Sequence, residues 1–259
     1  MNLHLKDKVV IVTGGASGIG ESIIRKLVDE DAIACIIDRN EERTIKLSNE
    51  LKQKHKKCFF VITDLIKTEA CKNAVDKIFN KFKRIDGLVN NAGLNDGVGL
   101  ENGSYEKFID SLQKNAVHYY SMAHYAIKYL RATKGSIVNT CSKVAETGQG
   151  GTSGYAAANG IRFELTEQWA SELFHYGIRV NAIVVAECWT PQYEWWINQQ
   201  ADPEEKLNAI NIKIPLEKRM TTPAEIADTA LFLLSSKSHS ITGEFFHVDG
   251  GYVHLDKNI

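Results

Sequence analysis

Residues 9–20 read VVIVTGGASGIG, and this stretch decides the fold. Residues 9–13 are all β-branched, which predicts a short buried strand. The glycines Gly14, Gly18 and Gly20 follow, and a helical pattern begins at about residue 18. A glycine-rich turn from a strand into a helix lets the backbone approach a pyrophosphate, which the helix N-terminus then attracts. The stretch therefore predicts a dinucleotide-binding unit.

An acidic residue at the end of the next predicted strand supports this interpretation. Asp38 lies eighteen residues after Gly20, where a carboxylate would accept hydrogen bonds from the adenosine ribose. A carboxylate there also repels a 2′-phosphate, which favours NAD over NADP. Ser17 agrees, since a basic residue in its place would bind that phosphate, whereas Arg39 points the other way.

Strand-like and helix-like segments alternate along most of the chain. Strands are expected at residues 9–13, 33–38, 58–63, 87–90, 136–140, 178–184 and 244–248. Helices are expected at residues 18–30, 41–54, 68–83, 104–131, 153–176 and 223–236. This alternation predicts an α/β fold, a Rossmann-type doubly wound parallel sheet with helices on both faces in three layers. We expect one domain over residues 1–259.

The segment at 188–215 does not follow the alternation. Three of the four prolines, Pro191, Pro203 and Pro215, fall within it, together with Trp189, Tyr193, Trp195 and Trp196. It fits neither a clean strand nor one uninterrupted helix. We expect a substrate lid at about residues 188–215.

Composition limits the function classes. The 259 residues carry 31 basic and 32 acidic side chains, and 44% are hydrophobic, which excludes disorder. Without an excess of Lys and Arg, a nucleic-acid partner is not expected. The apolar runs are too short for a membrane span, and the first residues show no signal-peptide core. Five scattered cysteines suggest free thiols, so we expect a cytoplasmic protein without a metal site.

Several motifs occur in the order typical of one family. They are Thr13 with the Gly-x-x-x-Gly-x-Gly that follows it, Asp64-Leu65, Asn90-Asn91-Ala92-Gly93, Asn115, Ser142, Tyr155 and Val248-Asp249-Gly250-Gly251. Over essentially its whole length the chain resembles the short-chain dehydrogenase/reductase family. The resemblance implies an NAD-binding set at Gly14, Ser17, Gly18, Ile19, Gly20, Asp38, Arg39, Asp64, Leu65, Asn91, Ala92, Gly93, Tyr155, Asn159, Cys188 and Thr190.

The same resemblance implies a catalytic set. Hydride transfer from an alcohol needs a base for the hydroxyl proton and a donor that stabilises the developing oxyanion. The family uses a tyrosine as acid/base and a serine thirteen residues earlier, which match Tyr155 and Ser142. Asn115 matches the family's fourth polar member.

The family's lysine, four residues after the tyrosine, is missing. Asn159 stands in its place; an amide can hydrogen-bond the nicotinamide ribose but carries no charge to stabilise a tyrosinate. Three explanations stay open: a mutated site, a protein that binds NAD without turnover, or a substrate that needs less help. We favour the third, because an anomeric hydroxyl is more acidic than a simple alcohol. Lys143 is a candidate replacement cation, although an exposed loop lysine is the more ordinary interpretation.

The expected substrate site carries polar and aromatic residues. A polyhydroxylated ligand suits these residues, since carboxylates accept hydrogen bonds from hydroxyls and aromatic faces pack on sugar C–H groups. The residues expected to form the substrate site are Ser142, Glu146, Gln149, Tyr155, Glu187 and Trp189. Segments 95–100, 186–191 and 251–256 most resemble the L-fucose (aldose) dehydrogenases of the family. This resemblance implies oxidation of a free sugar at the anomeric carbon, by a homotetramer.

Two alternatives remain. A steroid or acyl substrate would require an apolar pocket into which Glu187 and Gln149 do not point. A catalytically weakened NAD(H) sensor would explain the missing lysine and would bind NADH without turnover.

Overall fold

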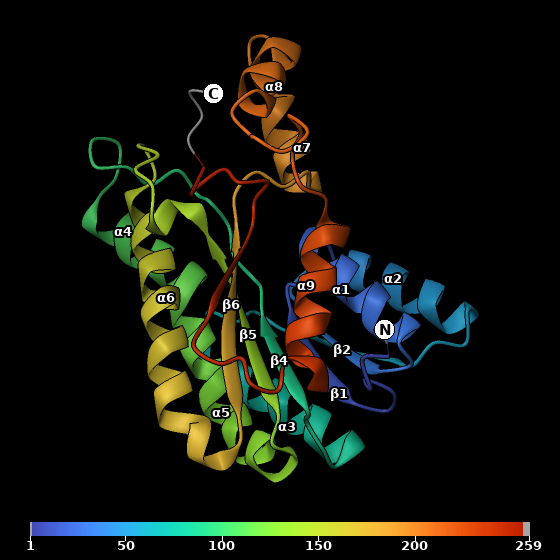
Figure 1. Ribbon diagram of the computed structural model, residues 1–259. Coiled ribbons are helices and arrows are strands. Elements are labelled where there is room, and N and C mark those ends of the chain that lie inside the picture. Colours follow the sequence, from blue (N-terminus) through green and yellow to red (C-terminus); the bar gives the residue numbers. More distant parts are fainter. Residues whose placement is uncertain (1, 256–259) are drawn as a thin grey trace.

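Seven parallel strands form one sheet in the computed structural model, which describes residues 2–255 (Figure 1). The strand order is β3-β2-β1-β4-β5-β6-β7, which reverses direction between β1 and β4. The strands are β1 (Val9–Thr13), β2 (Ile33–Asp38), β3 (Cys58–Ile62), β4 (Gly87–Asn90), β5 (Ser136–Ser142), β6 (Arg179–Val185) and β7 (Phe245–Val248). The predicted doubly wound parallel sheet is confirmed.

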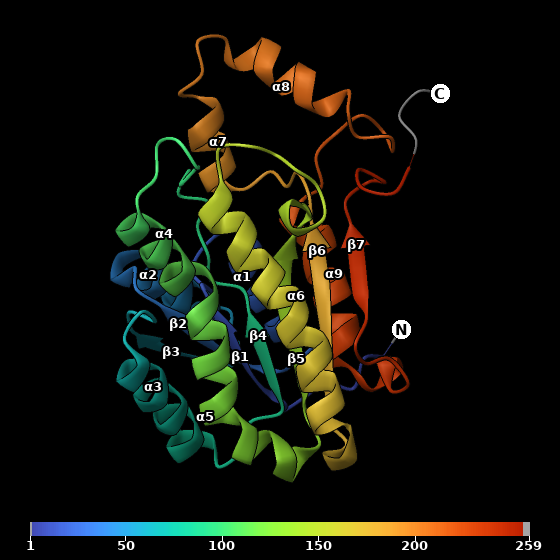
Figure 2. The same ribbon diagram turned by 90° about the vertical axis from the view of Figure 1, so that its left-hand side faces the viewer.

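Helices cover both faces of the sheet, as Figure 2 shows. They are α1 (Gly18–Asp29), α2 (Glu41–Gln53), α3 (Thr68–Phe82), α4 (Tyr105–Leu112), α5 (His118–Thr133), α6 (Ser153–Leu173), α7 (Pro191–Ile197), α8 (Pro203–Asn211) and α9 (Pro223–Leu234). Alternate residues of β1 face opposite layers: Val10 and Val12 pack with α1 and α9, whereas Val9 and Ile11 pack with α3 and α5. Burial on both faces explains the continuous apolar runs.

The helix expected at 104–131 is interrupted, so that prediction was wrong in detail. A π-helical segment, η1 (Gln113–Val117), separates α4 from α5. Asn115 lies in η1; its Oδ1 accepts from Leu94 N at 2.7 Å and its Nδ2 donates to Ser111 O at 3.0 Å. These bonds tie the widened turn to the loop after β4, a contact that helical periodicity does not reveal.

The segment at 188–215 forms two short helices beyond the end of the sheet, α7 and α8 (Figures 1 and 2). Each starts at a capping side chain followed by proline: Thr190 accepts from Tyr193 N at 3.2 Å, and Asp202 accepts from Glu205 N at 2.9 Å. Proline fits the first helical turn because its missing N–H would be unpaired there. Among residues 2–255, no helix combines the length and hydropathy needed to cross a membrane.

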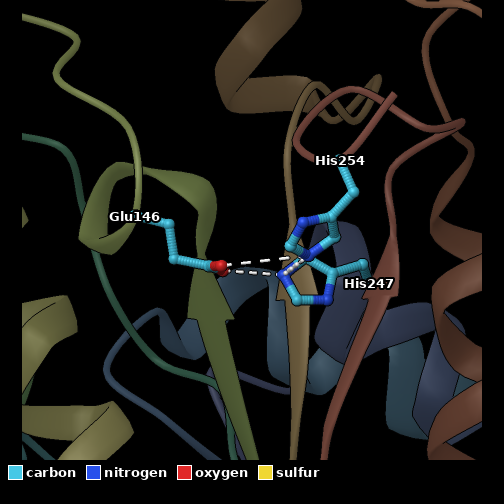
Figure 3. A group of neighbouring side chains, drawn as sticks. All are labelled: Glu146, His247 and His254. Carbon is cyan, nitrogen blue, oxygen red and sulfur yellow. Dashed lines mark hydrogen bonds and ion pairs between the residues drawn. The ribbon is translucent and has the colours of Figure 1, made fainter. Parts of the chain in front are cut away.

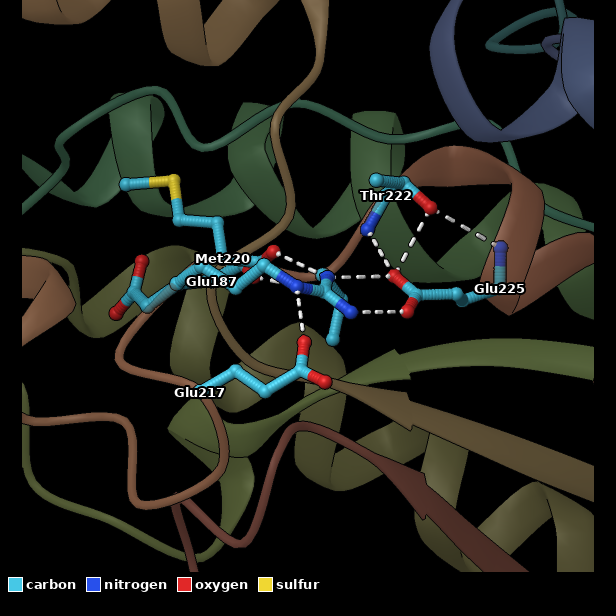
Figure 4. A network of polar contacts seen from close by, with 7 residues as sticks. Glu187, Glu217, Met220, Thr222 and Glu225 are labelled. Atoms are coloured by element: carbon cyan, nitrogen blue, oxygen red, sulfur yellow. Dashed lines mark hydrogen bonds and ion pairs between the residues drawn. The ribbon is translucent and has the colours of Figure 1, made fainter.

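A polar network joins the residues that follow the 188–215 segment to the start of α9 (Figure 4). Arg219 donates to Glu217 at 2.6 Å and to Glu225 at 2.7 Å, and Glu225 also accepts from Thr222 N at 2.7 Å as part of the α9 capping box. Thr221 N donates to Glu187 O at 3.0 Å. The residues that flank the 188–215 segment are thereby joined beside the N-terminus of α9.

Candidate active site

A cleft of about 420 Å³ opens where the strand order reverses. Loops that follow β1, β2, β3, β4 and β6 contribute to its wall, together with the end of β5. Open parallel sheets bind ligands at this point because the loops on either side diverge there. Of the predicted residues, those that line it are Gly14, Ser17, Gly18, Ile19, Asp38, Arg39, Asp64, Leu65, Asn91, Ala92, Gly93, Ser142, Tyr155 and Thr190.

The glycine loop has the geometry of a phosphate cradle. Gly14 and Gly18 adopt φ values of +64° and +56°, which favour glycine. A Cβ on Gly20 would lie 2.1 Å from the Gly14 carbonyl oxygen, so Gly20 serves close packing and does not line the cleft. Ser17, the N-cap of α1, makes no side-chain cap bond. The first N–H groups of α1 are therefore available to a pyrophosphate.

Thr13 and Asn91 hold two walls of the cleft together. Thr13 Oγ1 accepts from the backbone N–H groups of Asn91 and Ala92 at 2.9 and 3.1 Å. Asn91 Nδ2 donates to Thr13 O at 3.0 Å. These bonds fix the loop after β4 against the glycine loop.

Asp38 lines the end of the cleft where the adenosine is expected. Its Oδ2 accepts from Ala16 N at 3.1 Å and its Oδ1 accepts from Asn40 N at 2.9 Å. The carboxylate is therefore held in place at the point where the ribose is expected. Arg39 and Arg43 line the same end.

Ser142 and Tyr155 reach the opposite end of the cleft from separate elements. Ser142 is the last residue of β5, and Tyr155 lies in the first turn of α6. Asn115 does not line this cleft: it is fully buried, and both ends of its amide are bonded to the backbone. Asn115 therefore supports the structure around the site without lining the cleft.

Asn159, which is expected to bind the nicotinamide ribose, lies outside the cleft lining. The side chain is fully buried; Nδ2 donates to Tyr155 O at 2.9 Å, and Oδ1 accepts from Arg162 Nη1 at 3.1 Å. Both ends of the amide are thus used within the protein.

Arg162 is the residue that the sequence reasoning missed. It is 2% exposed yet lines the cleft; its Nε donates to Asn115 O at 2.6 Å and its Nη1 donates to Thr140 O at 3.1 Å. Its guanidinium carbon lies 5.7 Å from the centre of the Tyr155 ring. The available signal was its position seven residues after Tyr155, on the same helix face as Asn159.

Lys143 and Glu187 form a buried ion pair beside Ser142. The expectation that Lys143 is an exposed loop residue was therefore wrong, and its charge is neutralised. Glu187 also accepts from the Tyr193 hydroxyl at 2.6 Å, and Lys143 lies 3.9 Å from the centre of the Tyr252 ring. Burial, and then the Glu187 charge, raise the pKa of Tyr193. Glu187 is therefore occupied by partners within the protein.

The remaining predicted residues lie outside the cleft lining: Glu146, Gln149, Glu187, Cys188 and Trp189. Glu146 Oε1 lies 2.7 Å from His247 Nε2, and Gln149 is exposed. Burial raises the pKa of the Cys188 thiol to about 12, which leaves it unreactive at neutral pH.

The residues present fit a nicotinamide dinucleotide, because the switch-point cleft combines an uncapped helix N-terminus, a fixed ribose-side carboxylate and a Ser–Tyr pair. Together they define a nucleotide-dependent oxidoreductase. A family model described as Enoyl-(Acyl carrier protein) reductase matches residues 14–253. The chain belongs to the short-chain dehydrogenase/reductase family, whose members bind NAD or NADP.

Named relatives include sugar and acyl enzymes. L-fucose dehydrogenase of Bos taurus is 33% identical over 252 residues, covering 97% of this chain and 91% of the relative. The 3-oxoacyl-[acyl-carrier-protein] reductase FabG of Thermotoga maritima is 31% identical, covering 97% and 100%. A crystal structure of Cj0485 dehydrogenase superposes with a TM-score of 0.94 at 40% identity, covering 100% and 99%. Thermoplasma acidophilum aldohexose dehydrogenase gives 0.89 at 27% identity, covering 99% and 98%.

Proposed function

We propose that the protein oxidises a free, L-fucose-like aldose at its anomeric carbon to the lactone, with NAD as oxidant. The observation that carries the proposal is the placement of Ser142 and Tyr155 in the same cleft as Asp38. Relatives named L-fucose dehydrogenase and aldohexose dehydrogenase support the substrate class.

The proposed chemistry divides between two side chains. Ser142 donates a hydrogen bond to the reacting oxygen and holds the anomeric carbon in position. Tyr155, as tyrosinate, takes the hydroxyl proton while the C–H hydride leaves. The bound nicotinamide supplies the hydride acceptor, so sugar and NAD⁺ become lactone, NADH and a proton.

NAD is proposed as the cofactor because of Asp38. Its carboxylate is anchored by Ala16 N and Asn40 N and would lie against a 2′-phosphate. Like charges brought together in this way cost several kcal/mol. Arg39 and Arg43 are exposed at the same end, where the surrounding water weakens their compensating attraction.

The lid at 188–215 is proposed to close over the sugar. Thr190, near the start of the lid, lines the cleft. Trp189, immediately before Thr190, is 36% exposed, so the Trp189 ring is available to pack on a sugar face. Glu187, immediately before the lid, pairs with Lys143, which follows Ser142. This ion pair joins the lid to the end of the cleft that holds Ser142.

NADH formation across a panel of free aldoses tests the proposal. The panel includes L-fucose, D-arabinose and L-galactose, from neutral to alkaline pH, with NADP in parallel and Tyr155→Phe as control. Tyrosine-dependent turnover with one sugar stereochemistry and NAD is expected. NADH binding without turnover on any alcohol would instead favour the sensor.

An acyl substrate is the second candidate. The matching family description and the FabG relative favour it. NADH- or NADPH-dependent reduction of a 3-oxoacyl thioester, with no sugar turnover, would select it. In either case the five free cysteines suit the reducing cytoplasm in which we place the protein.

A further inference from the structure

We propose that Arg162 is a positioning residue whose positive charge promotes loss of the Tyr155 proton, in place of the lysine that the family carries at position 159. The inference rests on the proposed role of Tyr155 but not on the identity of the substrate. Asn159 is neutral, and Lys143 is neutralised by Glu187. Among residues 2–255, Arg162 is therefore the cation that lies beside Tyr155 without a carboxylate partner, with its guanidinium carbon 5.7 Å from the centre of the Tyr155 ring.

Three anchors hold the Arg162 side chain in the wall between α6 and η1. It donates to Asn115 O at 2.6 Å, Thr140 O at 3.1 Å and Asn159 Oδ1 at 3.1 Å. All three are neutral acceptors, and within residues 2–255 no carboxylate lies within 4.0 Å of the guanidinium. Its charge is thus held without being neutralised, and an arginine stays protonated at every pH used for assay.

Arg162 also carries one hydrogen-bond donor that is unpaired among the described residues. Nη2 of Arg162 is fully buried and has no hydrogen-bond partner among the described residues. It lies beside Gly93, where a Cβ would approach it to 2.7 Å, and both residues line the cleft. A buried unpaired guanidinium N–H is costly, so we expect a cofactor hydroxyl or an ordered water to accept from it.

Other charges around Tyr155 and Arg162 do not substitute. The charged and titratable groups on the elements packed against this part of α6 are Tyr105, Glu106, Lys107 and Asp110 on α4, Lys114 on η1, Cys141 on β5, Lys143 on η2 (Lys143–Ala145) and Arg179 on β6. His118 and Tyr119, at the start of α5, also lie near Arg162. Lys114 pairs with Asp110, and Arg179 lies at the opposite end of its strand. Burial, followed by the charge of Arg162, lowers the pKa of His118 to about 4, so His118 is neutral at pH 7.

The pH dependence of kcat for wild type, Arg162→Lys and Arg162→Met tests the proposal. Arg162→Met is expected to lower kcat at pH 7 by on the order of 10–100-fold and to recover as pH rises, because hydroxide then removes the Tyr155 proton. Arg162→Lys should keep most of the neutral-pH activity. A loss of kcat that is equal at every pH would mean that Arg162 is only structural and would overturn the proposal.

A second variant guards against misfolding. Asn159→Lys combined with Arg162→Met returns the charge to the family position and should restore neutral-pH turnover.

The ultraviolet absorbance of tyrosinate, taken as the difference from matched Tyr155→Phe variants, needs no substrate. In Arg162→Met the Tyr155-dependent signal should appear at higher pH. An unchanged signal refutes the Arg162 role even if sugar oxidation is confirmed, whereas a shifted signal upholds it even if no sugar reacts.

A separate observation carries a second inference: we infer that Glu146, His247 and His254 bind a divalent metal ion of the zinc type (Figure 3). His247 Nε2 lies 2.7 Å from Glu146 Oε1 and 3.2 Å from His254 Nε2, and His254 Nε2 lies 3.9 Å from Glu146 Oε2. Zn–N and Zn–O bonds of about 2.0–2.1 Å place neighbouring tetrahedral ligands roughly 3.3 Å apart, close to this spacing.

A backbone turn between His247 and His254 brings these two side chains together. Asp249, which is buried, accepts from Gly251 N at 2.8 Å and from Val253 N at 2.9 Å. The turn returns His254 beside His247, with the ring centres 4.3 Å apart. Two imidazoles and one carboxylate leave a fourth position open to water, and the ion would tie the C-terminal turn to the loop after Ser142.

Zinc content after equilibrium dialysis tests this site. The full chain should retain about one Zn²⁺ more per chain than His254→Ala or Glu146→Gln, with His239→Ala, an exposed histidine elsewhere, as matched control. Co²⁺ should give the intense visible bands of four-coordinate cobalt in wild type and in His239→Ala only. Equal retention by wild type and both ligand variants would refute the site.

Discussion

Asp38 is the side chain on which the proposed choice of NAD rests. It is held by two backbone N–H groups, one from the glycine loop and one from the start of α2. Because the loop and the carboxylate are bonded to each other, we expect the positions of the pyrophosphate and the ribose to be coupled.

Asp38→Asn should therefore raise the NADP preference, measured as the ratio of kcat/KM for NADP to that for NAD, by about 10–100-fold. Removing a like charge of this kind is worth a few kcal/mol, and each 1.4 kcal/mol is about tenfold. Glu69→Gln, an exposed carboxylate on α3, is the control and should leave the ratio unchanged. If both variants behave alike, cofactor choice lies elsewhere.

Gly20 supports the loop by its lack of a side chain. In Gly20→Ala the new Cβ would meet Gly14 O at 2.1 Å and Asn91 Nδ2 at 2.7 Å. We expect a loss of about 1–3 kcal/mol of unfolding free energy and weaker NADH binding, because the loop must move. Gly160→Ala is the matched control: nothing lies within 4 Å of its Cβ, and alanine should stabilise helix α6 by about 0.5–1 kcal/mol. Denaturant unfolding measures the change in stability of each variant, and NADH fluorescence measures the change in NADH binding.

At the scale of the element, the interruption at η1 brings several functional groups to the cleft. The π-helical turn presents the Asn115 carbonyl to Arg162, and His118 directly after it donates from Nε2 to Lys114 O at 2.9 Å as the neutral tautomer. An uninterrupted α-helix would have a different register along this face. The position of Arg162 depends on that break.

His118 should make the protein sensitive to acid. Burial, and secondarily Arg162, lower its pKa to about 4, below its value of about 6.5 in the unfolded chain. The stability from keeping His118 neutral is fully present above pH 6.5 and is lost as pH falls through 4. The loss is up to about 3 kcal/mol. Urea unfolding at pH 7 and pH 4.5 should show a smaller decrease for His118→Gln than for wild type, while the exposed His239→Gln should behave like wild type.

At the scale of the whole molecule, α5 and α6 lie in the same helical layer (Figure 2). Large apolar side chains remain exposed on this layer. Val117 and Tyr120 are 47% and 54% exposed, and Ile161 and Phe174 are 39% and 65% exposed. Groups of this kind commonly mark contacts between subunits.

We therefore expect a homotetramer in which these helices meet copies of themselves. Light scattering coupled to size exclusion should give the mass of four chains, and Tyr120→Glu with Phe174→Glu should reduce it. A charge placed against its own symmetry copy repels, since a two-fold interface brings the same patch together. Lys237→Glu, on the exposed turn after α9, is the control. A monomer in wild type would contradict the prediction.

The sequence by itself determined the layers, the sheet and the cofactor end. β-Branched runs, glycine turns and capping residues act within a few neighbours, so their consequences can be deduced from spacing alone. Residues 9–20 and Asp38 therefore predicted the loop and its acid. The family resemblance, and not the spacing alone, implied that Ser142 and Tyr155 share one site, and both line the cleft.

Only the tertiary structure decided which charges are free. Lys143 meets Glu187 across 44 residues of sequence, and Glu146 meets His247 across 101. Arg162 gains its place from backbone carbonyls on η1 and β5, while Asn159 is turned inward. Burial and ion pairing depend on which segments pack together in space, and local spacing along the chain carries no information about that packing.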